Sequence, residues 1–270
     1  MHLRISREAG TRGSLRFSPL FLLLTSLLFA GLVHADQESG YDPQIWRDRT
    51  GAAIQAELTA AWGPYAFFAF ADGRSMFFPI AHLDRRSRKQ IQARLAELAE
   101  DRASGPGAFA SFIRDHRVRL ADDGYLRPDP GHASEEPPEF YLLVLGQADH
   151  PVGRQLMERL ARLDAEWAGR GWSSCEIVWV SRDRWNRAMQ RVFREIEPGF
   201  GALRFGHRFD DRLRILDYGV YPVLALVDRY GNLLLHSVRG REIEPPGKLL
   251  QRLDYMLPYA EETGVARLRQ

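Results

Sequence analysis

Cysteine is almost missing from this chain of 270 residues, since Cys175 is the only one. An internal disulfide is therefore excluded, and so is any reaction that needs two thiols of one chain. Cys175 opens the apolar run IVWV, where a cysteine commonly serves as a small buried hydrophobe. A second interpretation, a reactive thiol that bridges to another chain, stays open.

Lysine is also scarce, because Lys89 and Lys248 are the only two and every other basic residue is arginine. The arginines are spread along the chain. On a predicted helix at 183–196 they repeat at helical spacing opposite apolar side chains, which is typical of a solvated face. The alternative is a phosphate-binding stripe. These arginines are Arg184, Arg187, Arg191 and Arg194. We expect no nucleic-acid partner.

Long apolar runs are absent except near the amino end, where FSPLFLLLTSLLFAGLVHA follows four arginines. Basic residues, an apolar core and small residues at Val33 and Ala35 are the anatomy of a secretory signal peptide. We therefore predict that residues 1–35 are removed on export to the periplasm or the extracellular space. An uncleaved membrane anchor is the alternative, and it would be the only membrane contact.

Removal of that segment changes the charge balance. The whole chain has a formal net charge of +2, but residues 1–35 hold four arginines and one glutamate. The remainder carries 33 basic and 34 acidic side chains, a net charge of −1.

Signatures of common catalytic and cofactor sites are missing too. We find no Ser/His/Asp arrangement and no glycine-rich phosphate loop, and the eight histidines show no metal-ligand spacing. The sequence thus predicts no cofactor, no metal and no catalytic residue of a standard hydrolase. What it does contain, 45% hydrophobic residues over this length, is enough for two globular domains of mixed α and β structure.

The first predicted domain covers residues 45–101. Alternating apolar residues and turn signals predict three short strands in a meander, with an Asp72-Gly73 hairpin turn. Asp84 then serves as the expected N-cap of a helix to about Ala99. The order WRDRTG, IQAEL and FFAFADGRSMFFPIAHLDRRSRKQI resembles the first type of Sla homology domain, an SH3-like β-barrel. That resemblance implies protein binding and carries over no individual binding residue.

Residues 102–139 are predicted to be a linker that contains a hairpin, RVRLADDGYLRP, with Asp123-Gly124 in its turn. Residues 258–270 are predicted to be a tail.

The second predicted domain, residues 140–257, alternates strand and helix periods as a sheet covered by helices requires. Its order is βαβ and then strand, turn, strand, helix. The runs EIVWVSRDR, FGALRF and YPVLALVDRYGNLL resemble the nucleoredoxin and tryparedoxin branch of thioredoxin-like proteins. The resemblance implies a thioredoxin fold in which Pro222 is cis at the start of a central strand and marks a peptide groove. Tyr221 departs from the aliphatic residue usual in that branch.

The other half of that expected groove has lost its thiols. Redox members place Cys-x-x-Cys at the start of the first helix, but here LGQADHPVGRQL puts His150, Pro151, Val152 and Gly153 there. Asp149 or His150 then caps the helix, with Pro151 in its first turn. A general base or ligand-binding role for His150 is the alternative.

Three functions follow from this reading. The first is an exported adaptor, redox-inactive, that holds a protein or peptide of unknown identity in a groove formed by Asp149, His150, Pro151, Tyr221 and Pro222. The second is a thiol-disulfide oxidoreductase that acts through Cys175 alone. The third is self-association through the thioredoxin-like half.

Overall fold

The computed structural model describes residues 43–62, 64–102, 108–129, 137–216, 218–239 and 242–263. The predicted signal peptide, residues 1–35, lies outside them. Within the described segments, no helix is long and apolar enough to cross a bilayer. The chain from Tyr41 onward forms one compact unit. The domain boundaries expected from the sequence stay a prediction.

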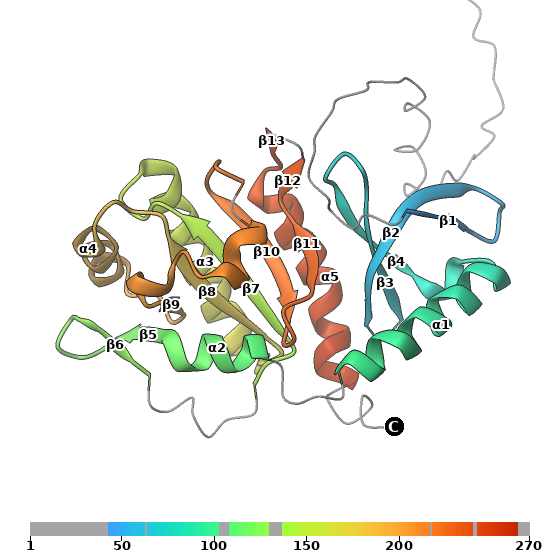
Figure 1. Ribbon diagram of the computed structural model, residues 1–270. Coiled ribbons are helices and arrows are strands. Elements are labelled where there is room, and N and C mark those ends of the chain that lie inside the picture. The colour runs from blue at the N-terminus through green and yellow to red at the C-terminus, as the bar shows by residue number, and fades with distance from the viewer. Residues whose placement is uncertain are drawn as a thin grey trace, which may run out of the picture. The chain divides into compact units, whose positions relative to one another are not determined.

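A small antiparallel sheet comes first (Figure 1), with strands in the order β1-β2-β3-β4. Its strands are β1 (Gln44–Arg47), β2 (Ala53–Trp62), β3 (Tyr65–Ala69) and β4 (Ser75–Pro79). The meander expected from the sequence is present. The expected SH3-like barrel is not shown, because the sheet is open: β1 and β4 are its two edges, and in the described residues only an isolated bridge, Asp48 to Leu83, links their flanks.

Helix α1 (Arg85–Arg102) follows the small sheet after a short 3-10 turn. The carboxylate of Asp84 accepts a hydrogen bond from the Ser87 backbone N–H at 2.7 Å, as an N-cap does. Hydrogen bonds from the backbone and from the side chain of Ser87 hold the pKa of Asp84 below its usual value. Ile91 of α1 packs with Trp46, Phe68 and other residues on one face of the sheet.

The continuous apolar run of β3 reflects burial on both faces of the strand. Phe68 faces the cluster beneath α1, whereas Tyr65 and Phe67 belong to the main core. The Tyr65 and Tyr255 rings meet edge to face at 6.1 Å between centroids. Neither face of β3 is therefore left for a ligand.

The large sheet has seven strands in the order β11-β10-β7-β8-β9-β5-β6. The strands are β5 (Arg117–Leu120), β6 (Leu126–Pro128), β7 (Phe140–Gly146), β8 (Cys175–Ser181), β9 (Gly201–Leu203), β10 (Val223–Asp228) and β11 (Leu233–His236). Strands β7, β8 and β9 run parallel, and the other neighbouring pairs run antiparallel. The four strands β11-β10-β7-β8, with a helix between β7 and β8, have the order of the thioredoxin fold, which confirms that expectation.

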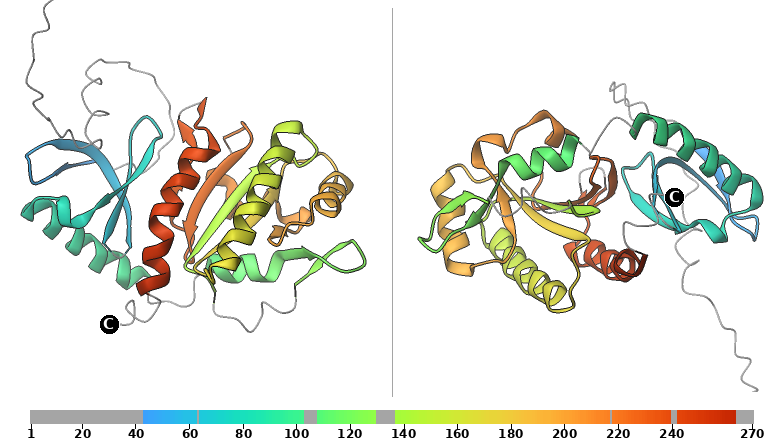
Figure 2. Two further views of the ribbon diagram at one scale, coloured as in Figure 1. Left: turned by 180° about the vertical axis from the view of Figure 1, so that it is seen from behind. Right: turned by 90° about the horizontal axis from the view of Figure 1, so that it is seen from below.

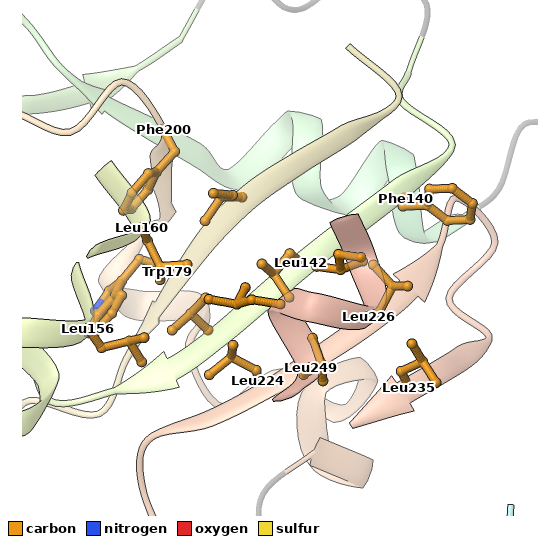
Figure 3. Close-up of a cluster of buried hydrophobic side chains, with 14 of the residues drawn as sticks. Phe140, Leu142, Leu156, Leu160, Trp179, Phe200, Leu224, Leu226, Leu235 and Leu249 are labelled. Carbon is orange, nitrogen blue, oxygen red and sulfur yellow. The ribbon is translucent and has the colours of Figure 1, made fainter. Parts of the chain in front are cut away.

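Helices cover both faces of this sheet (Figures 1 and 2). One core cluster contains side chains from α3 (Pro151–Gly169), α4 (Asn186–Ile196) and α5 (Pro246–Thr263). The other contains side chains from α2 (Ala108–His116) and the 3-10 helix η4 (Asp211–Leu216). Figure 3 shows the first cluster, where Leu142, Leu224 and Trp179 of neighbouring strands point to the same side. Both faces are buried, so the central strands need continuous apolar runs rather than alternation.

Two parts of the sequence-based prediction need correction. The hairpin expected inside the 102–139 linker is present, but its strands β5 and β6 extend the large sheet beyond β9. Strand β9 consequently lies inside the sheet, between β8 and β5. Helix α5 also continues to Thr263, past the start of the expected tail at 258.

The β10–β11 hairpin follows directly from its sequence. One oxygen of Asp228 accepts hydrogen bonds from the backbone N–H groups of Tyr230 and Asn232, at 2.9 Å each. Gly231 takes the positive φ, +93°, that the turn requires. The chain then continues into a small ladder formed by β12 (Val238–Arg239) and β13 (Glu242–Ile243).

His236, the last residue of β11, is buried where the small sheet meets the large one. Its backbone N–H donates to Ser75 Oγ at 2.9 Å, and its ring stacks on that of Tyr218 at 5.5 Å between centroids. Burial, and secondarily the charge of Arg252, lower the pKa of His236 to about 4. The neutral imidazole is therefore the form that fits the folded protein.

We predict that this histidine makes the fold sensitive to acid. The unfolded chain takes up a proton near pH 6.5 and the folded one near pH 4, so stability is lost as the pH falls between these values, by about 3 kcal/mol at most. Urea unfolding at several pH values should show a shallower loss in His236→Gln than in wild type. The same change at exposed His82 serves as the control, and equal slopes in all three proteins would contradict the prediction.

Candidate functional site

The candidate groove residues lie at the carboxyl ends of β7 and β8, where parallel strands commonly present ligand sites. Asp149, His150 and Pro151 link β7 to α3 and are exposed. Tyr221 and Pro222 come just before β10, whose first residue pairs with Leu145 of β7. The register brings both segments to one edge of the sheet, with buried Pro222 beside Gly146.

The Tyr221–Pro222 peptide bond is cis, as the resemblance implied. Gly146, opposite Pro222, has little free space around it. A Cβ atom at Gly146 would lie 3.0 Å from the Trp179 ring and 3.6 Å from Pro222 Cβ. The loop that contains Pro222 is thus packed directly against the end of β7.

His150 is the N-cap of α3. Its Nδ1 accepts a hydrogen bond from the Val152 backbone N–H at 3.3 Å, and Pro151 takes the first helical position. This is the capping arrangement expected from the sequence, and it occupies one ring nitrogen. Among the described residues His150 has no side chain in position to exchange a proton with it, so its role as a general base stays a hypothesis.

Gly153 packs against the loop that precedes the helix, and that contact leaves no space for a side chain. A Cβ atom there would lie 1.8 Å from the carbonyl oxygen of Gln147. In the redox proteins that this segment resembles, the corresponding position carries the second thiol. Here a thiol could be introduced only if the backbone at Gln147 moved.

A buried carboxyl group lies beneath this helix start, and sequence reasoning did not single it out. Asp183, 3% exposed, accepts a hydrogen bond from Ser181 Oγ at 2.7 Å and one from the Asp149 backbone N–H at 3.3 Å. Burial, and a hydrogen bond with the Asp149 carboxyl, raise the pKa of Asp183 above its ordinary value. The signal in the sequence was an acid two residues after a buried strand.

Arg182, which sequence reasoning also missed, contacts both the end of β7 and the loop before β10. Its backbone N–H donates to Gly146 O at 2.7 Å, and its guanidinium carbon lies 4.9 Å from the centre of the Phe209 ring and 5.8 Å from that of Tyr221. Its Nη1 donates to the backbone oxygen of Arg208. The aromatic ring at position 221, unusual in the branch that the sequence resembles, therefore lies within cation–π distance of a buried arginine.

Cys175 lies away from this edge. It begins β8 and pairs with Phe140, at the opposite end of the strand from Ser181. Six residue steps at about 3.3 Å each separate the two ends by roughly 20 Å. Its side chain is half-buried and packs against the main core, which is consistent with the structural interpretation.

Metal binding has no support in the part of the chain that is described, where no group of three or more His, Cys, Asp or Glu side chains converges.

Comparison with known proteins extends these observations only slightly. No family model matches the chain, and no curated protein matches it. Among solved structures, thioredoxin from Wuchereria bancrofti is 19% identical with a TM-score of 0.38, over 53% of this chain and 97% of that one. Tryparedoxin I from Crithidia fasciculata is 14% identical with a TM-score of 0.38, over 53% and 90%.

A third similar structure is a putative thiol:disulfide interchange protein from Chlorobium tepidum, 18% identical with a TM-score of 0.35, over 44% of this chain and 80% of that one. Identities and TM-scores this low carry no argument of their own. The thioredoxin-like assignment therefore rests on the strand order, and no activity is carried over from these proteins.

The contact at Gly153 gives a direct prediction. Gly153→Ala should lower the free energy of unfolding by about 1–3 kcal/mol, because the added methyl group meets a backbone oxygen in a packed loop. Gly169→Ala is the matched control on the same helix, since a Cβ there meets nothing within 4 Å. That change should be neutral or stabilise by about 0.5–1 kcal/mol. Urea denaturation of both variants decides the matter, and a Gly153→Ala protein as stable as wild type would show that the loop is not packed as described.

Proposed function

We propose that this chain is an exported partner-binding protein that holds an extended protein segment at the carboxyl edge of its thioredoxin-like sheet and performs no dithiol chemistry. The observation that carries the proposal is the state of the α3 start. Gly153 lacks both a thiol and the space for one, His150 caps the helix, and Cys175 lies roughly 20 Å away along β8.

Exposed apolar side chains at this edge support binding as the remaining role. Val152, Trp185 and Phe209 are 50%, 54% and 64% exposed. Val152 lies in the first turn of α3, after β7, and Trp185 and Phe209 lie in the loops after β8 and β9, so all three follow the carboxyl ends of parallel strands. Large apolar side chains gathered on one exposed surface commonly mark an interaction site.

An extended segment fits this edge better than a small molecule. A cleft between α3 and α5 contains Arg162 and Asp254, away from this edge, whereas the carboxyl edge presents exposed apolar side chains. Thioredoxin-like folds hold extended peptides beside the proline loop by backbone pairing, and the Tyr221–Pro222 loop is the corresponding place here.

The role of the small sheet belongs to the same proposal. The resemblance of residues 45–101 to a Sla homology domain supports a protein-binding function for this part, which would make the chain an adaptor with two binding surfaces. Since both faces of β3 are covered, we expect such binding at the sheet edges or at exposed Ile45 of β1, which is 58% exposed.

The absence of redox activity can be tested directly. We expect the mature protein, residues 36–270, to reduce insulin with dithiothreitol no faster than the uncatalysed reaction, and Cys175→Ser to behave identically. Thioredoxin serves as the positive control. Catalysis by the wild type that disappears in Cys175→Ser would overturn the proposal in favour of a single-cysteine oxidoreductase.

Binding can be tested with a random library of 12-residue peptides displayed on phage and selected on the mature protein. We expect enriched peptides whose affinity falls at least tenfold in Trp185→Ala. Tyr125→Ala is the matched control, because Tyr125 is also 54% exposed but lies in the β5–β6 turn at the other edge of the sheet. A selection that enriches nothing, or peptides that bind Trp185→Ala as well as wild type, would contradict the proposed site.

A further inference from the structure

Arginine and aromatic side chains alternate at the carboxyl edge. The Arg208 guanidinium lies 3.7 Å from the Phe205 ring centre and 4.4 Å from that of Phe209. Arg182 lies 4.9 Å from the same Phe209 ring and 5.8 Å from Tyr221. We name the five residues Phe205, Arg208, Phe209, Arg182 and Tyr221 the arginine–aromatic ladder. It runs from the loop after β9 to the residue that precedes Pro222.

The ladder brings positive charges close together. Burial, and the charge of Arg182, lower the pKa of Arg208, so the two guanidinium groups repel each other. Arg208 donates to the Phe205 carbonyl at 2.8 Å, while its buried Nε has no hydrogen-bond partner. A negatively charged group beside Arg208 would relieve that repulsion.

A second pair of arginines continues this surface. Arg184 and Arg187 lie 5.1 Å and 6.0 Å from the centre of the exposed Trp185 ring, and both are exposed. The part of the chain that is described shows no ion pair to either of them. Trp185 is the N-cap of α4 and follows Asp183 closely in the chain, so this surface begins where β8 ends, beside the ladder.

The acidic groups nearby do not neutralise these charges. Between residues 182 and 214 the chain has nine arginines and five acidic residues. Asp210 pairs with Arg212, Asp211 with Arg214 and Glu195 with Arg154, and Glu197 is exposed. Asp183 is buried, with a raised pKa. By residue count this stretch has a net charge of +4, although the mature chain as a whole is close to neutral.

We propose that the partner segment bound at this edge is an acidic peptide, whose carboxylates are held by Arg184, Arg187 and Arg208 while its apolar side chains contact Phe209 and Trp185. This inference rests on the proposed function, and it adds the chemical class of the partner. Guanidinium groups that are already held against aromatic rings lose little freedom when they bind a carboxylate, so the surface is preorganised for that partner.

The test uses three fluorescein-labelled peptides: (Glu-Ser-Glu-Leu)₃ and its analogues with glutamine or lysine in place of glutamate. Fluorescence anisotropy should show saturable binding of the glutamate peptide to the mature protein. We expect at least tenfold weaker binding of the glutamine peptide, none of the lysine peptide, and an affinity that falls as salt is added.

Two separate variants distinguish a loss of binding from a folding defect. Arg208→Glu alters the ladder, and Arg184→Glu combined with Arg187→Glu alters only exposed side chains. Each variant should bind the glutamate peptide with an affinity at least roughly tenfold lower than wild type. Arg162→Glu is the matched control, because exposed Arg162 lies eleven residues into α3, about 16 Å along the helix. Its affinity for the peptide should equal that of wild type.

The outcomes separate this inference from the proposed function. Library peptides that depend on Trp185 but lack acidic enrichment, and that bind both charge-reversed proteins as wild type does, would overturn the acidic partner and leave the binding site standing. An oligo-dT strand of equal charge that binds as tightly as the glutamate peptide would overturn the assignment to a peptide. A library without binders would overturn both proposals.

Discussion

Strand β7 is the element on which the rest of this structure depends. All seven of its residues are buried, and it pairs with β8 over its whole length and with β10 from Phe140 to Leu145. Because both edges and both faces of β7 are covered, its position is determined by two ladders and two hydrophobic clusters at once. The loops at its carboxyl end are held in place by β7. The Gly146 carbonyl accepts a hydrogen bond from the Arg182 backbone N–H, and the Gln147 carbonyl packs against Gly153.

The carboxyl edge of the sheet has no dithiol and presents other side-chain chemistry. A thioredoxin-like site depends on thiols activated at a helix start, and here that helix start is closed by a histidine cap and by a glycine packed on backbone. The neighbouring loops contain guanidinium groups held against aromatic rings, with Arg182 between Phe209 and Tyr221. An arrangement of this kind can recognise a partner through charge and apolar contact without any covalent step.

Much of this could be predicted from the sequence, because the decisive interactions were local. The Asp228 turn, the Asp84 cap and the cap and first turn of α3 each depend on residues within four positions of one another. Pro222 was identified from the resemblance of the run YPVLALVDRYGNLL to thioredoxin-like proteins. The order of strands and helices in the second half followed from hydrophobic periodicity alone.

The parts that sequence reasoning missed depend on contacts between distant segments. The hairpin of β5 and β6 looked like part of a linker, since nothing in its own residues indicates that Val118 pairs with Ala202 of β9. The expected barrel was inferred from turn chemistry that open and closed sheets share. Asp183 and Arg182 were part of a quoted motif, but their importance comes from Asp149 and Phe209, which lie elsewhere in the chain.

The sequence by itself determined the single cysteine, and with it the absence of any internal disulfide and of a dithiol. It also determined the local caps and turns, whose energies arise within a few residues. Tertiary structure alone decided that Gly153 has no space for a side chain, that the only thiol lies at the far end of β8, and that two arginines separated by twenty-six positions meet around one phenylalanine. The physical reason is that these properties are distances between segments, and such distances exist only after the sheet has assembled.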